Sequence, residues 1–255
     1  MFLFGIQIPG TARSRTGLHP AVAAGGGGRG PRCENVGMTG AEEFTPESER
    51  VMRVLRDEII DGTRAPGSKL VEREIAAELG VSRLPVRDAL RGLVGEGLVR
   101  PRPRSWAVVR EFSATDISDL HEIRSALETL GFRLAAQRRT RVGLAKLRAD
   151  LDAEQAAAAR GDGAGARRAA ADFHETVTEL ADNAMLSELE LALRSRMRWL
   201  LGQHDDFATM AEEHEELFRA IEARDVNGVV ELAERHLATS SDKIAARLRR
   251  AAAAE

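Results

Sequence analysis

Apolar residues recur at helical spacing along most of the chain beyond Pro46. A first helix ends near Asp61–Gly62 and carries on one face Val51, Val54, Leu55 and Ile59. A second helix covers Glu72–Leu79 and stops at Gly80. Ser82 is typical of the N-cap of a third helix, which Gly97 closes and whose apolar side is formed by Val86, Leu90, Leu93 and Val94. We therefore expect three short helices between residues 47 and 97.

Residues 100–110 break the helical pattern. This segment holds two prolines, followed by Trp106, Ala107, Val108 and Val109, a composition that favours a short β-hairpin. The two helices on either side of Gly80–Val81 have the spacing of a helix-turn-helix, and Gly80 supplies the left-handed backbone that the tight turn requires. The pattern predicts a winged helix-turn-helix domain over residues 44–110.

Beyond Ser113 the pattern is helical to the end of the chain. Six helices are expected, at 114–138, 141–159, 164–181, 185–202, 208–223 and 226–250, and residues 251–255 should fray. The expected fold is mainly α: an N-terminal winged helix-turn-helix, a linker at 111–113, and a C-terminal all-α six-helix bundle over 114–250.

Residues 1–43 show no helical or strand period. The stretch GGGGRG at 25–30 matches GxGxxG, but no strand precedes it and Pro31 follows, so we attribute the match to chance. We expect a disordered extension here, and Met38 is a candidate for the true start of translation. Cys33 is the single cysteine, which excludes an intrachain disulfide and a CxxC zinc site and favours a cytoplasmic protein. No run of about 18 apolar residues is present, so no membrane partner is expected.

Charge is distributed unevenly along the chain. The net charge of −3 argues by itself against a nucleic-acid-binding protein. Between Val81 and Arg110, however, seven arginines face only Asp88 and Glu96, a local charge of +5, whereas residues 111–255 carry −7. A basic segment of this kind is typical of a nucleic-acid interface, although an isolated run of charges is more often a solvated face.

The third helix would enter the major groove of DNA with its N-terminus first. Its first turn and a half presents Ser82, Arg83, Leu84 and Arg87. The helix N-terminus and the serine suit a phosphate, and the arginines can reach guanine edges or phosphates. Arg102 and Arg104, in the hairpin, would lie along the DNA backbone or the minor groove.

The string PGSKLVEREIAAELGVSRLPVRDALRGLVGEGLVRPRPRSWAVV, residues 66–109, resembles the winged-helix head of the GntR family of transcription regulators. The resemblance implies that Arg73 joins the operator contacts of the third helix. In that family a glycine usually precedes the final strand of the wing, and here Trp106 stands at about that place. Wing contacts are accordingly less well supported than helix contacts.

The helical half resembles the FCD effector domain of the FadR subfamily, through LHEIRSALE (120–128), ADFHETVTELADNAML (171–186), EEHEELFRAIEARD (212–225) and ERHL (234–237). Such domains commonly hold a divalent metal through one Asp and three His. The resemblance implies that His174, His214 and His236 bind zinc or nickel, the borderline ions that imidazole suits. Ala170 stands where the family has its Asp, and Asp172 falls on the opposite face of the helix.

The same resemblance places Arg124 at the effector pocket, where a guanidinium could clamp a carboxylate. The alternative is a surface ion pair between Arg124 and Glu128 within one helix. Further pocket candidates are Asn183 and Arg196, and the sequence leaves open which of Arg194, Arg196 and Arg198 faces inward. His121 and His204 match no ligand position, and we interpret them as surface or satisfied core residues.

Three functions are compatible with these residues. The first is a ligand-responsive transcription regulator: a homodimeric repressor that binds double-stranded operator DNA with a palindromic site and is released by a small organic or sugar acid. The second is a metal-dependent enzyme, but no HExxH motif or other general base marks one, so no enzymatic activity is expected. The third is a regulator whose helical domain no longer senses a ligand. This alternative stays open because Ala170 replaces the Asp ligand of the family. We predict the first.

Overall fold

A computed structural model describes residues 46–102 and 107–252. The expectations for residues 1–43, including a start at Met38, and those for Arg104 and Trp106 concern positions outside these ranges. The described chain is mostly helical, with three short strands near its beginning, which confirms the expected fold class. None of its helices is both long and apolar enough to cross a lipid bilayer.

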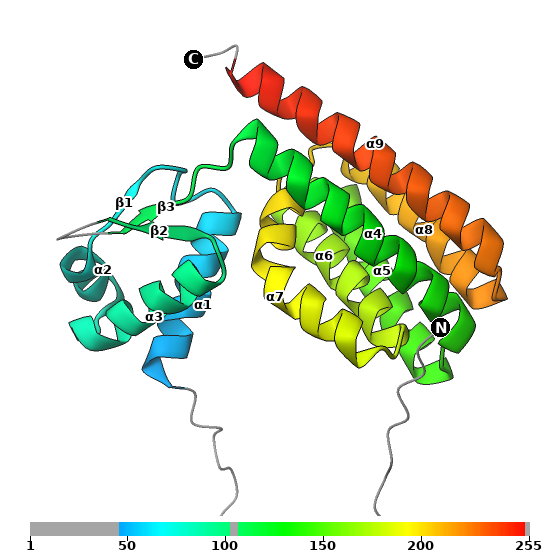
Figure 1. The fold of residues 1–255 in the computed structure, drawn as a ribbon, viewed down its shortest axis with the longest axis horizontal. Helices are drawn as coiled ribbons and strands as arrows, with labels where there is room; N and C mark the ends of the chain where they lie inside the picture. The colour runs from blue at the N-terminus through cyan, green and yellow to red at the C-terminus, as the bar shows by residue number, and fades with distance from the viewer. Residues whose placement is uncertain (1–45, 103–106, 253–255) are drawn as a thin grey trace, which may run out of the picture. The chain divides into compact units, whose positions relative to one another are not determined.

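The first part of the described chain has the predicted winged helix-turn-helix (Figure 1). Its helices are α1 (Glu47–Ile60), α2 (Glu72–Leu79) and α3 (Arg83–Gly95), and its strands are β1 (Lys69–Leu70), β2 (Val99–Pro101) and β3 (Ala107–Val109). The strands form one antiparallel sheet in the order β1-β3-β2. Strands β2 and β3 are the expected hairpin. Strand β1 was not predicted, because two residues carry no period and this strand depends on pairing with Val108 and Ala107 of β3.

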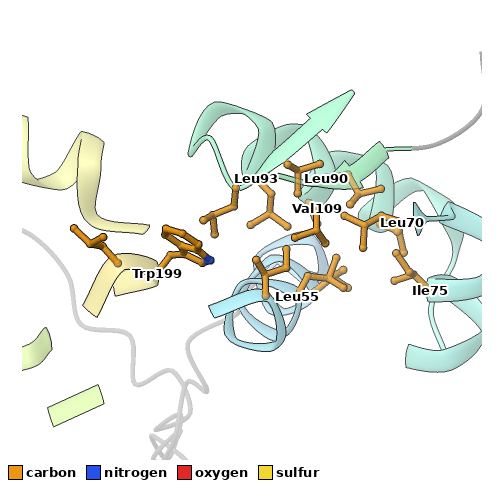
Figure 2. Packing of buried hydrophobic residues seen from close by; sticks show 14 of the residues in the cluster. Leu55, Leu70, Ile75, Leu90, Leu93, Val109 and Trp199 are labelled. Carbon is orange, nitrogen blue, oxygen red and sulfur yellow. The ribbon is translucent and has the colours of Figure 1, made fainter. Parts of the chain in front are cut away.

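The core of this part joins the three helices to the sheet. Figure 2 shows its side chains meeting between them, labelled Leu55, Leu70, Ile75, Leu90, Leu93 and Val109. Each is less than a tenth exposed, so each contributes roughly 1.5–3 kcal/mol of hydrophobic stabilisation. The same cluster includes Trp199, whose ring stacks on Phe112 with the ring centroids 4.0 Å apart. The apolar face predicted for the first helix is confirmed at Val51, Leu55 and Ile59.

Six helices follow over residues 114–252 of the described chain, within two residues of the predicted limits. They are α4 (Ala114–Arg138), α5 (Arg141–Ala159), α6 (Gly163–Leu180), α7 (Ala184–Leu201), α8 (Phe207–Ala223) and α9 (Val226–Ala252). Polar caps set where they begin: the side chains of Ser113, Thr140, Asp162, Asn183 and Asp206 each accept a backbone N–H from the first turn. At α4, Ser113 and Asp116 form a reciprocal capping box.

Helices α4, α5, α6, α8 and α9 pack side by side around one core (Figure 1). The buried residues of α7 belong instead to the core of the winged part, through Met197 and Leu200, and to a small cluster around Leu186. Helix α5 runs along α6, and α9 packs against both α4 and α8. Phe132, Phe173, Leu217 and Ile221 are at the centre of the core. The packing brings α4, α6, α8 and α9 together, so polar side chains that point inward from these helices meet inside the bundle.

Candidate nucleic-acid interface and metal centre

The turn between α2 and α3 presents the start of α3 to solvent. Gly80 adopts a left-handed backbone, with φ +66° and ψ +34°, and ends α2. Ser82 is the N-cap of α3, as predicted, but its side chain makes no capping hydrogen bond. Leu84, in the first turn, is 64% exposed, so its side chain is free to contact a partner.

Arginines surround an open cleft beside α3, between α2 and the hairpin. The cleft has a volume of about 610 Å³ and is lined, among others, by Arg73, Arg83, Arg87, Arg91 and Arg102. All the arginines predicted to contact DNA that fall within the described residues therefore meet at one surface. Among the described residues that line it, Glu72 is the single acid.

Glu72 binds both arginines of the first turns of α3. Its carboxylate accepts two hydrogen bonds from Arg87, each of 2.9 Å, and one of 3.3 Å from Arg83. The hydrogen bond from Arg87 is the main reason why the pKa of Glu72 lies below its usual value. In the protein without DNA, one carboxylate thus holds two cations that a phosphate or a guanine could also bind.

Three buried histidines converge inside the helical part. His174 of α6, His214 of α8 and His236 of α9 each offer a ring nitrogen, and these nitrogens lie within 4.8 Å of one another. All three side chains are less than a tenth exposed. Burial lowers the pKa of His174 and lowers that of His236 well below its ordinary value, so both rings are held neutral, which is the form that binds a metal.

Each of these histidines has a glutamate beside its Nδ1. Glu154 of α5 lies 2.7 Å from Nδ1 of His214, and Glu213 of α8 lies 2.6 Å from Nδ1 of His236. Within the described part of the chain, the Nε2 atoms of both rings are buried and have no hydrogen-bond partner. Orphaned ring nitrogens that share one centre are the donor set of a divalent zinc or nickel site, so these residues fit such an ion.

Carboxylates near the cluster are placed differently from the family pattern. Ala170 is fully buried in α6 and supplies no ligand. Asp172 is half exposed and pairs with Arg198. Glu128 of α4 lies 3.1 Å from Nδ1 of His174, and its Oε2 has no aligned hydrogen bond within the described chain.

Arg124 is completely buried beside the cluster. Its Nε donates to Glu128 at 2.9 Å and its Nη1 to Ser240 at 2.8 Å, while Nη2 lies 3.5 Å from Nε2 of His174. The intrahelical ion pair considered from the sequence is present, but it lies in the interior and not at the surface. Arg124 therefore places a guanidinium next to the histidines.

A cavity of about 80 Å³ opens next to the histidine cluster. Its lining includes His174 of that cluster and the neighbouring Glu128. Of the three arginines on α7, Arg194 and Arg198 line it. Arg196 instead donates to the backbone oxygen of Glu96 at 3.1 Å, and Asn183 caps α7 by accepting from the N–H of Leu186. None of the three predicted effector contacts, Arg124, Asn183 and Arg196, is among the residues that line the cavity.

Glu190, also on α7, lines this cavity and was not singled out from the sequence. Burial raises the pKa of its carboxyl to about 7. Its position three and four residues from Ser187 and Arg194 on the cavity face is a helical spacing that could have identified it. Spacing alone does not separate Glu190 from a solvated glutamate, because a glutamate on an amphipathic helix ordinarily faces water.

The two remaining histidines of the helical part lie outside the cluster. His204 is buried and its Nε2 lies 2.7 Å from Oγ of Ser240, while burial lowers its pKa to about 3. His121 is buried on α4, and burial lowers its pKa to about 4. His204 is thus a buried residue with one ring nitrogen satisfied, whereas both ring nitrogens of His121 lack a hydrogen-bond partner among the described residues.

Comparisons with known proteins match both parts of the chain. Residues 47–109 match the family described as bacterial regulatory proteins, gntR family, and residues 119–239 match the FCD domain. The HTH-type transcriptional repressor RspR of Escherichia coli is 28% identical over 203 residues, which cover 78% of this chain and 89% of that protein. A probable D-xylose utilization operon transcriptional repressor of Paenarthrobacter nicotinovorans is 34% identical over 171 residues, which cover 66% and 75%.

A solved structure is also similar. The crystal structure of a putative GntR transcriptional regulator from a Rhodococcus species is 27% identical, with a TM-score of 0.68. The match covers 79% of this chain and 99% of that one, so the similarity extends through the winged head and the helical domain.

Proposed function

Because the chain belongs to the GntR family of DNA-binding transcription regulators and carries an FCD domain, we propose that it is a repressor whose α3 reads operator DNA. The observation that carries this proposal is the arginine-lined cleft beside the N-terminus of α3. A buried or neutral helix face at this place would not support it.

The exposed start of α3 has the side chains that base recognition requires. Arg83 and Arg87 suit the O6 and N7 acceptors of guanine, and the exposed Leu84 suits a thymine methyl group. Ser82 and the helix N-terminus suit a phosphate. Arg73 and Arg102, with Arg104 beyond the described residues, would bind the backbone of the same duplex.

The proposal includes a homodimer that acts in the cytoplasm. Two heads of one dimer would bind two half-sites of a palindrome, because the two-fold symmetry of the protein is then matched by that of the DNA. Half-sites about one helical turn apart are expected.

In the helical domain we propose a divalent metal site at His174, His214 and His236, with zinc or nickel as the ion. When bound, such an ion acts as a Lewis acid toward oxygen ligands. The effector would then be a small organic or sugar acid, with its carboxylate near Arg124 and its remainder in the cavity lined by Arg194, Arg198 and Glu190. Metal analysis of the purified protein tests the site, and stoichiometric zinc or nickel is expected. Protein that holds no metal would contradict the proposal and would indicate that Ala170, in place of the Asp ligand, has abolished the site.

The DNA-binding proposal is tested with duplexes that the full-length protein selects from a random library. Arg83→Ala and Arg87→Ala should each weaken binding to the selected duplex by about 1–3 kcal/mol, measured by fluorescence anisotropy. Arg219→Ala is the matched control, since Arg219 is exposed on α8 and pairs only with Glu215 among the contacts described. Wild-type affinity in both α3 variants would contradict the assignment of the recognition helix.

A further inference from the structure

Two glutamates, Glu154 and Glu213, lie beside the histidine cluster and are not among its three proposed metal ligands. Resting on the metal site proposed above, we propose that Glu154 and Glu213 are positioning residues: each fixes one histidine so that its Nε2 lone pair points to the shared centre. The observation behind it is a repeated arrangement, in which a carboxylate from another helix lies at Nδ1 of His214 and of His236.

The chemistry of the pair determines where the ring proton sits. An ionised carboxylate accepts hydrogen bonds and donates none, so the nitrogen that faces it must carry the hydrogen. A neutral imidazole has one N–H and one lone pair. With Nδ1–H directed to Glu154, the lone pair of His214 is on Nε2, the atom that is buried without a partner in the described chain. The same argument applies to Glu213 and His236.

Packing fixes the plane of the His214 ring but not which edge faces the centre. The ring stacks on Phe173, with the ring centroids 4.5 Å apart and the planes 15° from parallel. A half-turn about the Cβ–Cγ bond would leave the ring in the same plane and keep the stacking, but it would exchange Nδ1 with Cδ2 and Nε2 with Cε1. The hydrogen bond to Glu154 is what distinguishes the two orientations, because only one of them places a donor at the carboxylate.

Burial indicates that Glu154 serves position more than stability. Both side chains of the Glu154–His214 pair are 0% exposed, and the second carboxylate oxygen of Glu154 has no hydrogen-bond partner in the described chain. A buried carboxyl group with a single hydrogen-bond partner is a net cost to folding. A costly group of this kind is expected where orientation of a ligand is required, and outer carboxylates of metal-bound histidines raise affinity in the same way.

Glu128 and His174 show a looser form of the arrangement. Oε2 of Glu128 lies 3.1 Å from Nδ1 of His174. Glu128 also accepts a hydrogen bond from Arg124, and Nη2 of Arg124 lies 3.5 Å from Nε2 of His174. The proposal is therefore restricted to the two pairs that have short hydrogen bonds.

The first measurement needs no metal. Long-range proton–nitrogen NMR on the full chain with labelled histidine reports which ring nitrogen carries the hydrogen in the metal-free protein. His214 and His236 should both be in the Nδ1–H form. Glu154→Ala should shift His214, but not His236, toward the Nε2–H form, and Glu213→Ala should do the reverse. Glu154→Gln, whose amide oxygen still accepts, should retain the wild-type form of His214.

The second measurement is zinc affinity, by competition with a chromophoric chelator. Glu154→Ala and Glu213→Ala should each lose roughly 10–100-fold, and Glu154→Gln should lose less. Glu215→Gln is the matched control, because Glu215 adjoins His214 in sequence but binds Arg148 and Arg219, and it should change neither readout.

The inference is overturned if the wild-type rings are in the Nε2–H form, or if the alanine variants keep both the wild-type form and wild-type zinc affinity. If Glu154→Ala does not fold, Glu213→Ala decides, since Glu213 is partly exposed. Wild-type protein that binds no zinc, but shows the expected forms and their loss on substitution, would remove the metal proposal and leave the positioning role established.

Discussion

Arg83 and Arg87 share the carboxylate of Glu72, and this pairing would affect DNA binding by α3, the proposed recognition helix. Glu72 must release both guanidinium groups before they reach a base edge or a phosphate. It also places a negative charge at the surface that would face DNA phosphates. A specific site can compensate through bidentate contacts to bases, whereas random sequence cannot.

Glu72→Gln should therefore strengthen binding to random duplex DNA at low salt more than it strengthens binding to the selected operator. A gain of roughly two- to fivefold on random DNA is expected, because exposed ion pairs contribute about 0.2–1 kcal/mol each. Glu78→Gln is the control, since it removes the same charge from α2 but pairs with Arg64. Anisotropy titrations check the effect; weaker binding of Glu72→Gln to both DNAs would show that Glu72 orients the arginines for DNA.

Among the individual site residues, some were predictable from the sequence and others were not. The three histidines were identified through family register, and the structure brings their nitrogens together. Glu154 was missed because a contact between α5 and α8 leaves no spacing signal in the chain. Glu213 flanks His214 in the sequence and fits an exposed helix face equally well, and its contact with His236 on α9 is a tertiary contact of the same kind. The choice among the arginines of α7 was also beyond the sequence, because 194, 196 and 198 are too close together for periodicity to separate them.

The elements themselves were predictable because local signals and tertiary packing agree. Caps at Ser113, Thr140 and Asp162 begin α4, α5 and α6 where the apolar pattern also begins. Strand β1 is the exception, since its two residues are a strand only through their pairing with β3. The helix-turn-helix depends on one further local feature, the left-handed turn at Gly80.

Two glycine substitutions test the role of that turn. Gly80→Ala should lower the free energy of unfolding by about 1 kcal/mol, because a side chain disfavours the left-handed backbone even though no atom lies within 4 Å of the added Cβ. Gly95→Ala, at the end of α3, also meets open space but has no positive φ. It should raise the free energy of unfolding by about 0.5–1 kcal/mol. Urea denaturation measures both, and equal effects of the same sign would refute the backbone explanation.

For the whole molecule, the overall charge is a poor guide to function and its distribution is a good one. The chain has a net charge of −3, yet arginines of α2, α3 and the hairpin line one cleft. Acidic residues dominate beyond residue 111, where the histidine cluster and its cavity lie. The two parts thus present different chemistry to different ligands, as a regulator that binds DNA and senses a metabolite requires.

The most direct test of this account is a footprint of the full-length protein on the DNA that flanks its own gene. We expect one protected region of two-fold symmetry, with half-sites about one helical turn apart, and no protection when Arg83 and Arg87 are both replaced by alanine. Flanking DNA that the wild-type protein leaves unprotected even at low salt, or protection that survives the double replacement, would contradict the claim that α3 reads an operator.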